Sequence, residues 1–303
     1  MRERYKAIGY CLFFCLVMLF CLDWVGQGGD FDFHFKKAQG SNFCKASHSE
    51  WKCTSYPPLF SWLATPFSGS LFTFKAFILL LFGFILPLTL FFISKRSIVV
   101  LLYYATSFFY VFVAGLYAQG LMLLFFLLFF IKTKGFRFEV WFLWFGLVLA
   151  APSIHNWALP LFLFAFIYRV FELVKSKWAF LSCSPFWGDT PKALEQPLPW
   201  FDAGNSSQSL TLNNFGSFLL KGCPFPFLFF GLKKIWFEQN WFKGLLILGS
   251  TGVAVFFNFR SLYLIPLLIL PEVVDLKQWW FKPLVCILIV FQFYQFVTLN
   301  LWC

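Results

Sequence analysis

Side chains that could accept a proton gather directly after the first apolar run of the chain, in the segment GQGGDFDFHFKKAQG at residues 26–40. Its titratable residues are Asp30, Asp32, His34, Lys36 and Lys37. A carboxylate at the boundary between water and an apolar medium is partly desolvated, which raises its basicity. Such a carboxylate can remove a proton from a hydroxyl group. The alternative interpretation is an acidic pair that is simply solvated beside an apolar segment.

Three further polar side chains could complete a site of this kind. Arg260 follows an apolar run, and its planar donor fork fits phosphate oxygens, although snorkelling at a membrane surface would also explain it. His155 lies between two apolar runs and could assist Arg260. Tyr56 opens the sequence Tyr-Pro-Pro-Leu and either lines a pocket or belongs to an interfacial aromatic belt.

The composition excludes an ordinary soluble domain. Of 303 residues, 60% are apolar, 24% are aromatic and only 12% are charged. Apolar runs that approach the roughly 17 to 25 residues needed to cross a bilayer as helix recur along the chain. In lipid, each run must satisfy its own backbone hydrogen bonds, so it must be helical. We therefore expect one all-α domain, residues 1–303, that is a polytopic membrane protein with about ten or eleven transmembrane helices.

The first run begins after the basic sequence MRERYK and lacks a small-residue cleavage site, so we interpret it as a retained span rather than a signal peptide. The predicted spans are residues 7–25, 71–93, 98–115, 116–131, 138–152, 157–174, 215–232, 242–259, 261–274 and 284–301.

Lysine and arginine set the orientation, because cytoplasmic loops retain them. With the N-terminus cytoplasmic, the basic clusters at 94–96, 132–137 and 175–177 all lie inside. We interpret residues 178–188 as a short or broken crossing, which places the loops 26–70 and 189–214 on the outer face of a plasma membrane. The alternative leaves 179–214 in the cytoplasm and places the basic sequences at 232–234 and 276–282 outside. Much of the net charge of +11 then reflects topology, and no nucleic-acid partner is predicted.

The outer loop 26–70 ends in SYPPLFSWLATPF at residues 55–67. Pro57 and Pro58 restrict the backbone to extended and turn conformations, so we expect a rigid turn that leads into a short aromatic surface helix. Cys44 and Cys53 lie in the same loop, where they either form a disulfide or stay as free thiols. Only Asp30, Asp32 and Glu50 could ligate a divalent metal there, and we predict neither a metal nor another cofactor.

The combination of Asp30 and His34 in DFDFH with YPPLF before the second span resembles the integral-membrane glycosyltransferases of the GT-C type. Weaker similarities are GLYAQGLMLLFF at 115–126, SIHNWALPLFLF at 153–164 and NFRSLYLIPLLIL at 258–270. The resemblance implies a polyprenyl-phosphate-linked sugar donor, no nucleotide, and a lipid, glycan or protein acceptor. It also implies that Asp30 is the general base, with Asp32 in reserve, and that substrate contacts come from His34, Tyr56, His155 and Arg260.

Two other classes of function suit an apolar chain of this kind. A transporter or lipid flippase would place ionisable groups near the middle of the bilayer. Glu139, Arg169 and Glu172 fall near the ends of predicted spans, and only Lys75 lies within a run, close to its start, which argues against a transport pathway. A noncatalytic subunit of a larger membrane transferase would need no base at all.

Overall fold

A computed structural model of the chain describes residues 2–27, 31–40, 58–130, 138–155, 158–177 and 281–298. All regular structure in these ranges is helical, and they contain no strand. The all-α class is therefore confirmed for this part of the chain. The predicted segments that lie wholly outside it are 178–188, 189–214, 215–232, 242–259 and 261–274, together with the pair Cys44 and Cys53.

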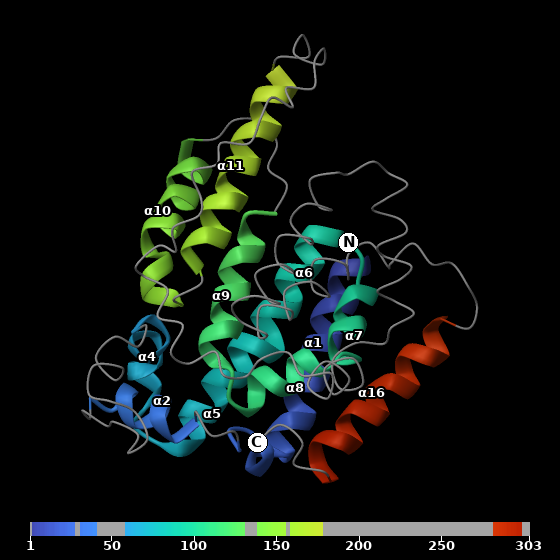
Figure 1. Cartoon of the computed structure of the whole chain (residues 1–303). Coiled ribbons are helices and arrows are strands. Elements are labelled where there is room, and N and C mark those ends of the chain that lie inside the picture. The colour runs from blue at the N-terminus through green and yellow to red at the C-terminus, as the bar shows by residue number, and fades with distance from the viewer. Residues whose placement is uncertain are drawn as a thin grey trace, which may run out of the picture.

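The helices form a bundle in which α2 and α4 cover one end (Figure 1). In chain order the first elements are α1 (Arg2–Phe20), η1 (Leu22–Trp24), α2 (Phe31–Ala38), α4 (Leu59–Ala64), η2 (Thr65–Phe67), α5 (Leu71–Ile78), η3 (Leu79–Ile85) and α6 (Leu86–Ser94). They are followed by α7 (Ile98–Tyr104), α8 (Ser107–Ala114), α9 (Tyr117–Leu128), α10 (Phe138–Ile154), α11 (Ala158–Lys177) and α16 (Phe281–Thr298).

The predicted spans and the helices agree closely. The run predicted at 71–93 is the continuous helix α5–η3–α6, and the short helix expected after Pro57 and Pro58 is α4, extended by η2. Among the described residues, one helix is long and apolar enough by itself to cross a membrane, Leu71–Ser94, with 24 residues. Because 61% of its most apolar stretch is buried in the bundle, its length and composition would also suit the core helix of a soluble protein.

A π-helical segment interrupts this long helix. In η3 the peptide N–H groups reach back five residues, as the bond from Leu86 N–H to the Leu81 carbonyl shows. Pro87 has no N–H, so it cannot donate a hydrogen bond to the Phe82 carbonyl, five residues back, or to the Gly83 carbonyl, four residues back. Two tyrosine hydroxyls from α7 donate to these carbonyls instead. Tyr103 Oη donates to the Phe82 carbonyl at 2.8 Å, and Tyr104 Oη donates to the Gly83 carbonyl.

The span predicted at 98–115 is broken into α7 and α8 at Ala105 and Thr106. Thr106 adopts extended backbone angles, and its hydroxyl donates to the Tyr103 carbonyl at 2.6 Å. Serine and threonine side chains compete with the helix for backbone groups, and here the Thr106 hydroxyl joins the Thr106 N–H in donating to the Tyr103 carbonyl at the end of α7.

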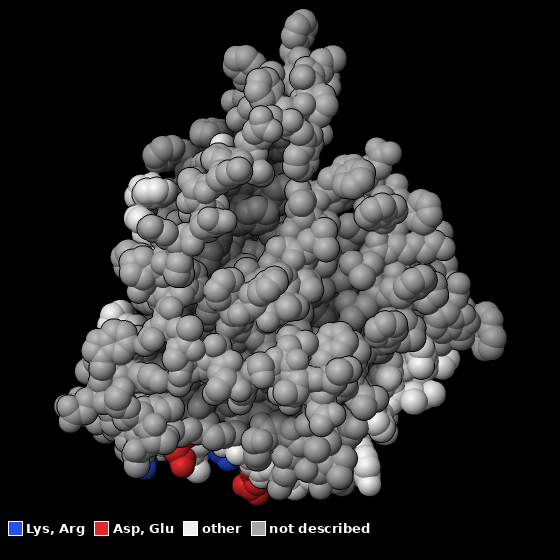
Figure 2. Space-filling model, viewed as in Figure 1, with Lys and Arg blue, Asp and Glu red and all other residues white. Residues whose placement is uncertain are grey.

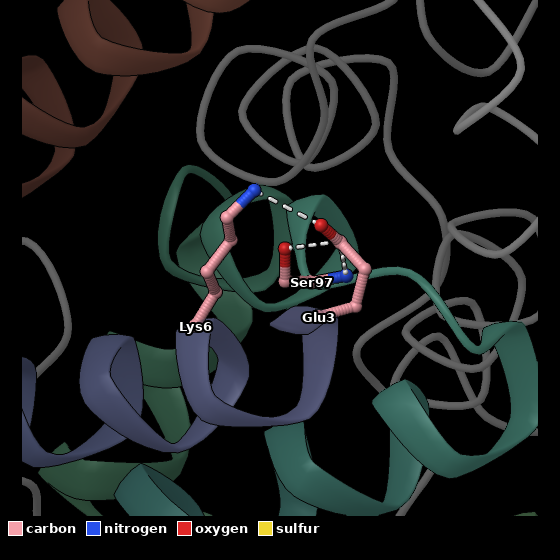
Figure 3. Close-up of polar contacts among 3 residues, drawn as sticks. All are labelled: Glu3, Lys6 and Ser97. Atoms are coloured by element: carbon pink, nitrogen blue, oxygen red, sulfur yellow. Dashed lines mark hydrogen bonds and ion pairs between the residues drawn. The ribbon is translucent and has the colours of Figure 1, made fainter. Parts of the chain in front are cut away.

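The first turn of α1 is tied to the turn between α6 and α7 (Figure 3). Ser97 donates to one carboxylate oxygen of Glu3, through its hydroxyl at 2.6 Å and its N–H at 3.2 Å. Lys6 Nζ lies 3.0 Å from the other oxygen. The Ser97 hydroxyl, followed by Lys6, lowers the pKa of the Glu3 carboxyl to about 2. The N-terminal end of α1 and the turn at 95–97 therefore lie at the same end of the bundle.

We expect Tyr103→Phe and Tyr104→Phe each to lower the free energy of unfolding by about 1–3 kcal/mol, because each change leaves a buried carbonyl without a donor. In a Pro87→Ala background the new N–H can serve one of these carbonyls, so one of the two tyrosine substitutions should cost much less. Thermal unfolding of purified protein measures the coupling. Fully additive losses would contradict the proposed link between Pro87 and the tyrosines.

We expect Glu3→Gln to lower the free energy of unfolding at pH 7 by about 0.5 kcal/mol, a small loss because the carboxylate is half exposed. The folded pKa is below the ordinary value of 4.5, so the stabilisation is complete above pH 4.5 and is lost as pH falls toward about 2. Stability measured at pH 7 and pH 3 should therefore differ less in Glu3→Gln than in the parent protein. Lys6→Gln is the control, since it keeps both Ser97 bonds and should keep most of the pH dependence.

Candidate functional site

Residues 31–38 of the charged segment that follows α1 form the short helix α2. Its alternation of acidic and aromatic residues would suit a strand, but Phe31, His34 and Ala38 recur at helical spacing and are buried together. Asp32 and Lys36 lie on the exposed side. α2 is therefore amphipathic, with one face against the bundle and its carboxylate directed away from it.

His34 is fully buried in a group of aromatic rings, called here the His34 cluster, which consists of Phe31, His34, Phe60, Phe74 and Tyr117. The imidazole ring is 5.0 Å from the Phe60 ring and 5.4 Å from the Tyr117 ring, with an edge-to-face arrangement in both cases. Phe60 and Tyr117 stack on each other at 5.0 Å. Aromatic pairs in these geometries stabilise a fold beyond the area that they bury.

The His34 cluster joins three of the segments that carry the resemblance described above. His34 comes from DFDFH, Phe60 comes from YPPLF, and Tyr117 comes from GLYAQG at the start of α9. Hydrogen bonds support the same contact, because Gln39 Nε2 donates to the Ser68 carbonyl at 3.1 Å and the Ser68 hydroxyl donates to the Ala38 carbonyl at 3.3 Å. Segments more than 80 positions apart in the sequence thus meet at one end of the bundle.

Two contacts fix the entry of the chain into this region. Lys75 Nζ donates to the Leu22 carbonyl at 2.9 Å and lies 5.7 Å from the centre of the Phe31 ring, so α5 holds η1, which follows α1. Gly26 has a φ of +79° and donates its N–H to the Val113 carbonyl at 3.0 Å. A Cβ atom at Gly26 would lie 2.1 Å from the Phe31 ring, so only glycine fits there.

The six predicted site residues divide into two groups. The structure describes Asp32, which is exposed on α2, His34, which is buried in its cluster, and His155, which is partly buried. His155 follows α10 in the turn to α11, and α10 contacts α4, so it belongs to the same end of the bundle (Figure 1). Asp30, Tyr56 and Arg260 lie outside the described residues.

The charged side chains near the cluster come from α2 and from Lys75 on α5. Lys37 is half-buried, its ammonium group is 5.4 Å from the centre of the Phe33 ring, and burial lowers the pKa of this ammonium. On the face shown in Figure 2, the described charged side chains that are visible lie at the lower edge, the end that carries α2. Among the described residues, no three His, Cys, Asp or Glu side chains lie close enough to hold a metal ion.

Sequence reasoning missed the residues that build the cluster around His34. Tyr117 lies in a segment with only a weak similarity, and Phe60 is one of 49 phenylalanines. The sequence did indicate a structural role for Lys75, because a lysine inside an apolar run needs a hydrogen-bond partner.

No protein-family model, curated protein or solved structure matches this chain. The resemblance to GT-C enzymes therefore depends on the motifs and on their arrangement.

We expect Gly120→Ala to destabilise the protein by about 1–3 kcal/mol through overpacking. A Cβ at Gly120 would lie 2.6 Å from the Phe82 ring and 3.1 Å from the Phe112 ring, and both rings are buried. The matched control is Gly146→Ala on exposed α10, where a Cβ meets nothing within 4 Å and alanine should be neutral or stabilising. Equal thermal stability of the two variants would show that α9 does not depend on close contact at Gly120.

Proposed function

We propose that this chain is a multi-pass membrane glycosyltransferase of the GT-C type, which transfers a sugar from a polyprenyl-phosphate-linked donor to an acceptor on the outer face of the membrane. The observation that carries the proposal is the meeting of DFDFH, YPPLF and GLYAQG in the His34 cluster. These segments carry the resemblance to the family, and a catalytic loop must be held against the helices that bind the donor.

Outward-facing apolar side chains support a membrane location. Helices α1, α10, α11 and α16 bury apolar residues inside the bundle and also expose apolar stripes at helical spacing on the outside. The exposed stripes are Leu12, Leu16 and Phe20; Phe142, Phe145 and Leu149; Leu159, Leu163 and Ile167; and Ile287, Val290 and Tyr294. Phe20 is 90% exposed. Helices that are apolar all round suit lipid, whereas water would leave these stripes unfavourably hydrated.

The two ends of the bundle support the predicted orientation. Ser97 adjoins the basic cluster at 94–96, and its contact with Glu3 holds this cluster beside the basic N-terminus. Both basic segments are expected on the cytoplasmic side. The His34 cluster lies at the opposite end in Figure 1, where α2, α4 and the turn after α10 are found. This is the end at which an outer-face enzyme would carry its catalytic loop.

The proposed chemistry needs a base for the acceptor and cations for the donor. The bond between the sugar and the lipid phosphate breaks as the acceptor oxygen or nitrogen bonds to the sugar, and a carboxylate takes the acceptor proton. Asp30 is the proposed base, with the exposed Asp32 as its reserve. Negative charge that develops on the leaving lipid phosphate would be met by Arg260 and His155.

Tyr56 completes the proposed substrate-binding set. His34, expected from the sequence to contact substrate, is fully buried among rings, so its proposed contribution is instead to hold α2, with Asp32, at the membrane surface. Lys36 and Lys37 are proposed to attract anionic lipid headgroups beside this surface.

We expect Asp30→Asn to abolish sugar transfer in membranes and Asp32→Asn to reduce it several-fold, because an amide cannot accept the acceptor proton. The measurement is transfer of radiolabelled sugar from polyprenyl-phosphate donors to endogenous acceptors. Glu139→Gln is the matched control, since this exposed carboxylate begins α10 at the opposite end and should leave transfer unchanged.

Retained transfer in both aspartate variants would overturn the catalytic role and favour a noncatalytic subunit. If transfer were absent from the parent protein while labelled lipid crossed the membrane, the chain would instead be a flippase.

A further inference from the structure

Two buried polar atoms lie in the contact between the C-terminal helix and the rest of the bundle. The Tyr110 side chain on α8 is 0% exposed, and the Gln292 side chain on α16 is 4% exposed. Within the part of the chain that the structure describes, neither the Tyr110 hydroxyl nor Gln292 Oε1 has a hydrogen-bond partner. Buried polar groups in folded proteins nearly always have one, so both atoms require an explanation.

The two atoms belong to the same interface. The Tyr110 ring is 5.2 Å from the Phe296 ring, and Phe296 lies one helical turn after Gln292 on α16. Residues four apart share one face of a helix, so Gln292 lies on the same face of α16 as Phe296, and α16 packs against both α7 and α8. Val285, at the start of the same face, is fully buried. Apart from Gln292, this face of α16 is apolar at its buried positions.

The chemistry of the pair is complementary. The tyrosine hydroxyl can donate, and the glutamine Oε1 can only accept. Neither atom has a partner among the described residues, so they make no direct bond with each other. A group between them that accepts from the tyrosine hydroxyl and donates to the amide oxygen would satisfy both, and a single hydroxyl does both.

We propose that the interface between α8 and α16 binds one hydroxyl group, which accepts from Tyr110 Oη and donates to Gln292 Oε1. This group is either a trapped water molecule or a hydroxyl of a bound sugar. A bridging water makes hydrogen bonds nearly as favourable as direct ones, and sites that satisfy buried polar groups are where such water is found. The bridge fastens α16 to the bundle by a polar contact inside an apolar interface.

The direction in which Tyr110→Phe changes the Tm tests the proposal. Removing a hydroxyl that has no partner is neutral or stabilising, whereas removing one that is bonded to a bridging group is destabilising. We expect Tyr110→Phe to lower the Tm of the purified protein by about 2–4 °C. In a Gln292→Met background the same change should lower the Tm by less than half as much, because the bridge is already lost.

Two other tyrosines calibrate the measurement. Tyr103→Phe removes a hydroxyl bonded to a carbonyl and should lower the Tm, whereas Tyr5→Phe alters a side chain on α1 that is 67% exposed and should have no effect. A Tm for Tyr110→Phe that equals or exceeds that of the parent protein, with and without substrate, would overturn the proposal. So would additive effects of Tyr110→Phe and Gln292→Met.

To distinguish a trapped water from a sugar hydroxyl, the Tm measurement is repeated with undecaprenyl-phosphate-linked glucose and mannose. A loss of Tm in Tyr110→Phe without these lipids identifies a trapped water. A loss that appears only when a lipid-linked sugar is added identifies a sugar hydroxyl. The arm without lipid does not depend on glycosyltransferase activity, so failure of the proposed function and failure of this site give different results.

Discussion

The fold depends on the satisfaction of backbone carbonyls inside an apolar bundle. Pro87 withholds a donor from two carbonyls of the central helix, and α7 supplies both donors through Tyr103 and Tyr104. An unmet carbonyl in such surroundings is costly, so these bonds fix how α7 lies against η3. The same segment of η3 carries Phe82, which stacks with Tyr117 at 6.3 Å. A local defect in one helix thereby sets the position of α9 and of the His34 cluster.

Elsewhere in the bundle, polar side chains mainly donate hydrogen bonds to groups near helix ends. Lys75 donates to the Leu22 carbonyl, Thr106 donates to the Tyr103 carbonyl, and Ser97 donates to the Glu3 carboxylate in the first turn of α1. An ion pair between Lys6 and Glu3 lies at the surface. Such an arrangement suits an apolar environment, where a backbone group without a partner costs more than a surface ion pair contributes.

The sequence predicts those features that depend on local patterns. The helix 71–94 follows from an uninterrupted apolar run, and the short helix α4 follows from Pro57 and Pro58. The break at Thr106 and the π-helical segment depend on partners from other helices, so no local pattern reveals them. The alternating pattern of DFDFH is ambiguous between strand and helix, and tertiary burial of His34 decides it. For the site, the sequence supplies Asp30, Tyr56 and Arg260 as predictions, whereas the neighbours of His34 emerge only from packing.

The contact between Glu3 and Ser97 joins residues 94 positions apart and has a consequence for the order of biosynthesis. The ribosome adds Glu3 long before Ser97 leaves its exit tunnel. The Glu3 carboxylate on α1 therefore has no Ser97 donor until the turn between α6 and α7 has been synthesised. The bond that fastens the first turn of α1 therefore forms later than the packing of α1 against η3 and α6, whose residues are synthesised earlier.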